Sequence, residues 1–257
     1  PMQVDLRFSV DDANALIFMP AAASLLLVFL AGSLADRWGP RRPLVMATLL
    51  YLLGAILVGL APSLPWVVLG RVLDGVGGVT MSIIALAAIN SSAADPGKRA
   101  RLFGVYAALA PAMFILSPSV TALIVEQANW RAGIVPWVLL GAASLMATLR
   151  YIPVGSTSTS TEWVTPLLAG LVLAGLALGV LNATTRPTLS LTLALMAVVS
   201  LAILVPVMRA HASPALNLRW CRGRGMLLLL AALAVASMPN MFFYTKLLLQ
   251  YRYTDPL

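Results

Sequence analysis

Two oppositely charged residues stand inside an otherwise apolar stretch of this sequence, residues 66–90. Arg71 and Asp74 are three positions apart, so a helix would let their side chains pair. Each charge costs about 2.5–3.5 kcal/mol on membrane insertion, and such residues usually face the protein interior and serve its function. Helical spacing also puts Arg71, Gly75, Gly78 and Ser82 on one face. The alternative is a structural ion pair near the membrane edge, and the residues alone leave both open.

A second candidate is the charged turn, residues 32–42 (Gly-Ser-Leu-Ala-Asp-Arg-Trp-Gly-Pro-Arg-Arg). Asp36 would lie at the C-terminal end of a helix, where the macrodipole disfavours an anion, so it needs a cation or another helix N-terminus as a partner. Gly32 would let a second helix pack closely, and Gly39 with the following proline would make a tight turn. Arg41 and Arg42 would anchor the loop at the membrane surface. A generic basic loop does not explain these residues together.

The composition indicates that lipid surrounds most of this chain. Hydrophobic residues make up 60% of it and charged residues 10%, against roughly 25% charged in soluble domains. A helix needs about 20 apolar residues to cross a ~30 Å hydrocarbon core, and β-barrel strands would instead alternate polar and apolar residues. We therefore predict an all-α polytopic membrane protein. Its eight expected spans are 15–35, 43–61, 66–90, 101–126, 132–152, 164–182, 188–208 and 226–248.

The basic residues predict the orientation. Loops 36–42, 91–101, 150–163 and 209–224 together hold eleven Lys or Arg residues, and the opposite side holds four. The positive-inside rule places the richer loops in the cytoplasm. The net charge of +8 is thus explained by topology, and nucleic acid is not expected as a partner.

Few other residues could carry chemistry. Cys221 is the single cysteine and His211 the single histidine, both in one predicted cytoplasmic loop. A lone cysteine supports neither an internal disulfide nor a metal site. The sequence offers no nucleophile–base pair, so we expect neither covalent catalysis nor a cofactor. The chain begins with Pro1 and ends just beyond a predicted span, and we expect it to be a fragment, cut at both ends.

The charged turn resembles the motif between helices 2 and 3 of the major facilitator superfamily. The matching residues, with Pro40 as a one-residue offset before the basic pair, are Gly32, Leu34, Ala35, Asp36, Arg37, Gly39, Arg41 and Arg42. The resemblance implies that the first span is helix 2, that helix 1 is missing, and that this turn acts as a gate. It also implies that the partner of Asp36 is a helix of the second bundle, beyond Leu257.

Two later spans extend the resemblance. Arg71, Gly75 and Gly77 match the helix-4 motif, whose arginine is associated with proton coupling, and Asp74 stands where glutamine is usual. This makes Arg71 and Asp74 proton-coupling candidates. Helix 5 of antiporters carries a Gly-Pro…Gly-Gly string, of which only Pro118 is identical here. The antiporter-like motif of this chain comprises Pro111, Ser117, Pro118 and Thr121, followed by a Trp-Arg pair at 130–131.

The spans before the final one indicate the branch. Two plain hydrophobic spans follow a Ser/Thr-rich stretch at 155–161, and residues 214–224 resemble the approach to helix 9 of fourteen-helix drug:proton antiporters. The chain would then cover helices 2–9. The predicted domains are an N-terminal bundle (1–155, helices 2–6), a linking pair of spans (156–215) and the first helix of the C-terminal bundle (216–257).

The resemblance implies a function. It suggests a secondary transporter in the bacterial inner membrane that exports amphipathic small molecules against protons by alternating access, and that is monomeric when full length. A twelve-helix transporter of another solute and a non-transporting membrane helper protein are the alternatives.

Overall fold

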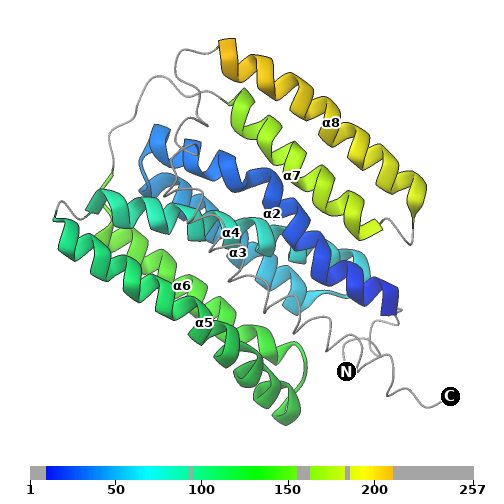
Figure 1. Ribbon diagram of the computed structural model, residues 1–257. Coiled ribbons are helices and arrows are strands. Elements are labelled where there is room, and N and C mark those ends of the chain that lie inside the picture. Colours follow the sequence, from blue (N-terminus) through cyan, green and yellow to red (C-terminus); the bar gives the residue numbers. More distant parts are fainter. Residues whose placement is uncertain (1–9, 93–94, 155–162, 183–185, 211–257) are drawn as a thin grey trace. The chain divides into compact units, whose positions relative to one another are not determined.

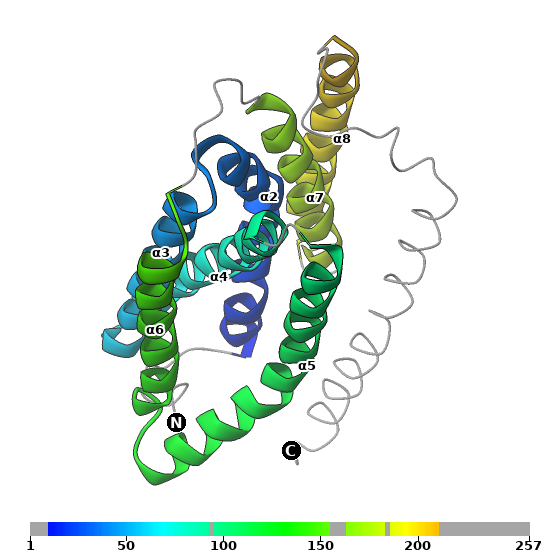
Figure 2. The ribbon, with the colours of Figure 1, turned by 90° about the vertical axis from the view of Figure 1, so that its left-hand side faces the viewer.

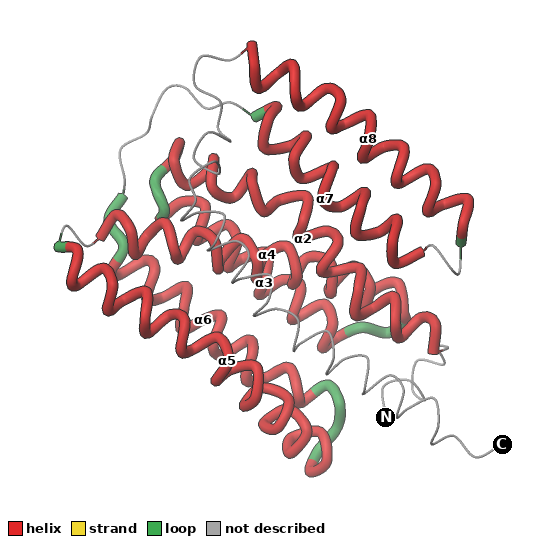
Figure 3. The backbone as a smooth tube through the Cα atoms, in the orientation of Figure 1, coloured by secondary structure: helices red, strands yellow, loops and turns green. Residues whose placement is uncertain are grey.

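The computed structural model describes residues 10–92, 95–154, 163–182 and 186–210, and in these ranges helices follow one another through short loops (Figure 3). The helices are α2 (Val10–Trp38), α3 (Arg41–Leu60), α4 (Leu64–Ser92), α5 (Pro96–Gln127), the 3₁₀ turn η1 (Ala132–Ile134), α6 (Val135–Tyr151), α7 (Val164–Asn182) and α8 (Pro187–Ala210). A helix lies at each predicted span up to residue 208. The predicted span 226–248 lies outside the described residues.

Most of the helices have the length and composition that crossing a membrane requires. Five stretches of the described residues could cross it: Arg41–Leu60, Leu64–Ser91, Pro96–Gln127, Ala132–Tyr151 and Pro187–Met208. Val164–Val180 of α7 is a shorter apolar helix. Among the described residues there is no strand, in keeping with the predicted all-α class.

The distribution of side chains also fits lipid. Large apolar side chains lie outside, with Leu60 75% and Val180 77% exposed. The buried positions are instead mostly small, and include Ala31, Ala47 and Thr48. Between membrane helices, small residues allow the close packing that replaces the hydrophobic drive of a soluble core. The Thr48 hydroxyl donates to the Leu44 carbonyl at 2.7 Å, so no unpaired polar group results.

Local residues explain where two helices begin and end. Gly39 has φ 70°, the left-handed conformation that ends α2 at Trp38 and turns the chain into α3. Asp95 caps α5, its carboxylate accepting from the Lys98 backbone N–H at 2.7 Å, with Pro96 at the first helical position.

The helices of the unit formed by residues 1–215 pack in a definite order, and the second unit, 216–257, lies outside the described residues. α4 packs against both α2 and α3, α6 lies on α3, α7 lies on α2, and α8 lies on α7 (Figure 1). α5 continues into η1 at one end and approaches α4 toward the other (Figure 2). The predicted linking pair, α7 and α8, is therefore attached to the helix that carries the charged turn.

Candidate functional site

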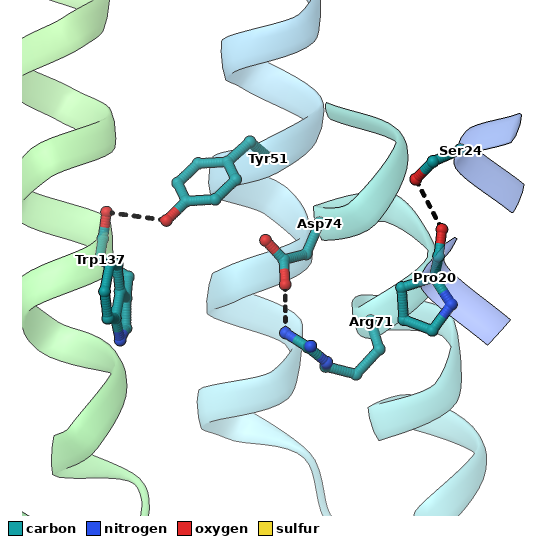
Figure 4. Close-up of polar contacts among 6 residues, drawn as sticks. All are labelled: Pro20, Ser24, Tyr51, Arg71, Asp74 and Trp137. Atoms are coloured by element: carbon teal, nitrogen blue, oxygen red, sulfur yellow. Dashed lines mark hydrogen bonds and ion pairs between the residues drawn. The ribbon is translucent and has the colours of Figure 1, made fainter. Parts of the chain in front are cut away.

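The charged pair predicted from the sequence forms within α4. The Arg71 guanidinium donates from Nη1 to Oδ2 of Asp74, one turn along the helix (Figure 4). The Asp74 side chain is 19% exposed and that of Arg71 42%. The acid is therefore the more enclosed partner, while the arginine keeps one side open.

Asp74 lies where α3 and α4 touch backbone to backbone. A Cβ added to Gly54 would lie 2.4 Å from the Asp74 amide nitrogen, and one added to Gly70 would lie 2.8 Å from the Gly54 carbonyl oxygen. One turn further along α4, a Cβ on Gly77 would lie 2.5 Å from the Tyr51 nitrogen. Real Cβ atoms do not approach so closely, so only glycine permits this crossing. The crossing fixes the position of Asp74 against α3.

A cavity of about 300 Å³ opens beside the pair. Its lining comes from α3, α4, η1 and α6: Tyr51, Ala55, Val58, Arg71, Asp74, Ile134 and Trp137. The Tyr51 hydroxyl points toward α6 and donates to the Trp137 carbonyl oxygen at 3.5 Å (Figure 4). Apolar and aromatic walls with a few convergent polar groups are typical of small-molecule sites.

Sequence reasoning missed the aromatic side of this cavity. Tyr51 could have been noticed as a residue with a polar tip inside the apolar span 43–61. Trp137 offered no such indication, because the sequence does not show that α6 lies beside the part of α4 that carries Asp74. Arg71, Gly75, Gly78 and Ser82 lie on one continuous helix, so they share a face, but their neighbours differ along it. Gly75 faces α2, where an added Cβ would lie 2.6 Å from the Pro20 Cβ, while the Ser82 carbonyl accepts from the Tyr106 hydroxyl of α5 at 3.3 Å.

The charged turn has the predicted shape but not all of the predicted contacts. Asp36 is exposed near the C-terminal end of α2, and no described residue pairs with it. No described helix packs closely at Gly32, because an added Cβ would meet nothing within 4 Å, and the expected close packing there stays a prediction. The close approaches between α3 and α4 occur at other glycines, such as Gly54 and Gly77.

Arg41 has a contact that the sequence could not reveal. Its Nη2 donates to the Leu149 carbonyl oxygen at 2.9 Å, in the last turn of α6. At the opposite ends of the same two helices, Nη2 of Arg131 donates to the Ala61 carbonyl oxygen at 3.2 Å, at the C-cap of α3. Each helix of this antiparallel pair thus has a carbonyl at its C-terminal end satisfied by an arginine at or just before the start of the other helix.

We predict that Arg41→Gln lowers the free energy of unfolding by about 1 kcal/mol, the value of one partly exposed hydrogen bond from a charged donor. Thermal unfolding of the purified protein in detergent measures this. Arg42→Gln is the matched control, since Arg42 is the exposed neighbour and donates to no described residue. Equal destabilisation by both variants would show that the bond to Leu149 is not what Arg41 contributes.

The helix-5 residues lie on a helix that continues through both prolines, Pro111 and Pro118. Pro111 and Pro118 are exposed and Ser117 is partly buried. Thr121 lies where a Cβ on Gly133 would be 3.1 Å from its Cγ2. The geometry leaves the antiporter-like role of these residues a prediction. Cys221 and His211 lie outside the described residues.

Comparisons with known proteins agree with this architecture. Over 152 residues the chain is 31% identical to the multidrug resistance protein Stp of Mycobacterium tuberculosis, covering 58% of this chain and 28% of Stp. It is 30% identical over 130 residues to the methylenomycin A resistance protein of Bacillus subtilis, covering 51% of this chain and 28% of that protein.

A human protein, solute carrier family 2, facilitated glucose transporter member 10, is 28% identical over 163 residues, covering 63% of this chain and 30% of the transporter. The chain spans less than a third of the length of each of these three relatives. A family model described as Major Facilitator Superfamily matches residues 1–252. This chain belongs to the major facilitator superfamily.

Proposed function

We propose that this protein exports amphipathic small molecules in exchange for protons by alternating access. The observation that carries the proposal is the Arg71–Asp74 pair at the wall of an aromatic-lined cavity inside an apolar helix. The family is one of membrane transporters, and the names of the two bacterial relatives denote resistance to drugs. Both relatives support export over import.

The pair suggests how a proton would act. Asp74 accepts a hydrogen bond from Arg71 while it is ionised. A proton on the carboxylate removes the negative charge that holds the guanidinium, and Arg71 is then free to turn toward its exposed side. In an apolar span the resulting change in electrostatic energy is large, because little water screens the two charges. Proton uptake and a rearrangement at the cavity wall are thereby one event.

Loop contacts support the proposed orientation. The start of α3 and the end of α6 lie at the same end of the two helices, as the Arg41 bond to Leu149 requires, and loops 61–63 and 128–131 meet at the other end through Arg131. We place the first of these ends in the cytoplasm of a bacterial inner-membrane protein, on the strength of its basic residues. In this view the bilayer, protons and a small-molecule substrate are the partners.

Dye efflux tests the proposal. The intact protein is inserted inside out into vesicles whose internal pH is lower than the external pH. The uptake of a fluorescent amphipathic cation into these vesicles is then followed. We expect uptake to depend on the pH gradient and to stop when an ionophore collapses it. Uptake that persists unchanged after the gradient is collapsed would contradict proton coupling.

The human relative favours a second candidate, facilitated transport of a polar solute. The lining of the cavity argues against it, because a sugar needs several polar partners and here apolar and aromatic side chains predominate. Uptake of radiolabelled glucose into the same vesicles without a pH gradient would support this alternative over export.

A further inference from the structure

Trp163 stands directly before α7, two residues after the Ser/Thr-rich stretch at 155–161. Its ring meets the ring of Trp38 edge-on, with centroids 6.3 Å apart and planes at 62°. The Arg37 guanidinium carbon lies 5.4 Å from the centroid of the same Trp163 ring. Arg37 and Trp38 are the last two residues of α2. One side chain of the linking pair therefore contacts the charged turn through two neighbouring residues.

The backbone of α7 holds Trp163 in this place. Seven residues further on, a Cβ added to Gly170 would lie 2.2 Å from the Leu26 carbonyl oxygen, so α7 touches the backbone of α2. Thr165, Pro166 and Ala169 are buried along the same segment. Trp163 is thus carried by a helix that is anchored on α2 two turns away, and its position does not depend on the loop before it.

The contact between Arg37 and Trp163 has the geometry of a cation–π interaction. The face of an indole ring attracts a guanidinium, and Trp has the strongest such attraction among the aromatic residues. Arg37 makes no ion pair with a described residue. The Trp163 ring is the partner that the structure gives to its guanidinium. Neighbouring Arg41 is held differently, by the α6 carbonyl, so the two arginines are tied to two different helices.

We propose that Trp163 is a positioning residue for Arg37, through which the linking pair controls the charged turn. This rests on the proposed transport function and on the gate role that the family resemblance implies for the turn. When the turn swings relative to α7, the guanidinium must leave the ring, so the contact stabilises one conformation of the transport cycle over the other. The linking pair then takes part in the transport cycle and is more than a spacer between two helix bundles.

Transport kinetics test the proposal in vesicles that carry the intact protein. We expect Trp163→Leu, which keeps an apolar side chain but has no π face, to lower the maximal efflux rate about three- to tenfold, the size set by one cation–π contact. KM should stay unchanged, and Trp163→Phe should restore most of the rate. Trp66→Ala, at an exposed tryptophan of α4, is the control and should behave as the parent.

A double variant separates positioning from general packing. Arg37→Gln should slow efflux as Trp163→Leu does, and the double variant should be no slower than either, because both remove one contact. Rate losses that multiply in the double variant, or a Trp163→Phe variant as slow as Trp163→Leu, would overturn the proposal.

Thiol labelling tests the contact without any transport. Cys221 and any other native cysteine are replaced by serine, Arg37→Cys is introduced, and a membrane-impermeant maleimide is added on the cytoplasmic side. We expect Trp163→Ala to raise the labelling rate at position 37 severalfold, with folding checked by size exclusion. Equal rates would overturn the proposal, and Trp163→Leu serves if the alanine variant does not fold. Vesicles that show this protection but no proton-driven efflux would refute the proposed function and leave the contact standing.

Discussion

Replacing Asp74 with asparagine is expected to abolish proton-driven efflux while leaving the protein folded in the membrane. Asparagine keeps the size of the side chain and can still accept a hydrogen bond from Arg71, but it cannot release a proton. The loss of driven uptake in vesicles should be about 10- to 100-fold, as expected when a coupling free energy of ~1–3 kcal/mol is removed. Counterflow, in which labelled substrate exchanges without a pH gradient, should persist.

Two controls give this result its meaning. Glu126→Gln removes a carboxylate from an exposed position of α5 and should leave driven uptake as in the parent. Asp74→Glu retains an ionisable group and should retain part of the coupling. Full driven uptake by Asp74→Asn would show that the pair is only a structural ion pair. An equal loss of driven uptake and counterflow would show that Asp74 supports binding or folding, and coupling would then have to be sought in other residues.

Replacing Gly77 with alanine is expected to separate α3 from α4 and to destabilise the bundle strongly. The added Cβ would lie 2.5 Å from the Tyr51 nitrogen and 2.7 Å from the Ala47 carbonyl oxygen, both backbone atoms that cannot turn aside. Overpacking typically costs about 1–3 kcal/mol, and a clash with backbone belongs at the upper end or beyond. Thermal unfolding in detergent should show a much lower Tm, and Tyr51 should lose its place beside Asp74.

Gly78→Ala is the matched control, since it makes the same change one residue along α4. There the added Cβ would meet only Cδ2 of Tyr51, at 3.9 Å, an ordinary contact. Its Tm should equal or exceed that of the parent, because alanine is the better helix former. A Tm for Gly78→Ala as low as that for Gly77→Ala would mean that the crossing of α3 and α4 does not lie where the structure puts it.

The helices were predictable because the membrane imposes their length. The span predicted at 66–90 is α4, Leu64–Ser92, and the turn predicted from Gly39 is made by that glycine at φ 70°. Both predictions depend on local rules: an apolar run must cover the hydrocarbon, and a left-handed turn favours glycine. The Arg71–Asp74 pair is local in the same sense, three residues apart on one helix.

Contacts between helices were not predictable, because a nearly uniform apolar sequence does not show which face meets which neighbour. Gly32 illustrates this: it has the residue type of a close crossing but open space around it, whereas Gly54 makes the closest approach to Asp74. Tyr51 and Trp137 meet at the cavity across 86 positions of sequence. The linking pair gave no sign in its sequence that α7 would lie on α2.

The arginine caps on α3 and α6 have a consequence for biosynthesis. The Ala61 carbonyl receives its bond from Arg131, 70 positions later. At roughly 5–20 residues per second of synthesis, α3 spends several seconds with that end uncapped. The Leu149 carbonyl can accept its hydrogen bond as soon as it is synthesised, because its donor, Arg41, comes earlier in the chain. The C-terminal end of α3 therefore gains its hydrogen bond only after the loop before α6 has been synthesised. A ribosome stalled before residue 131 would leave this end of α3 without its partner.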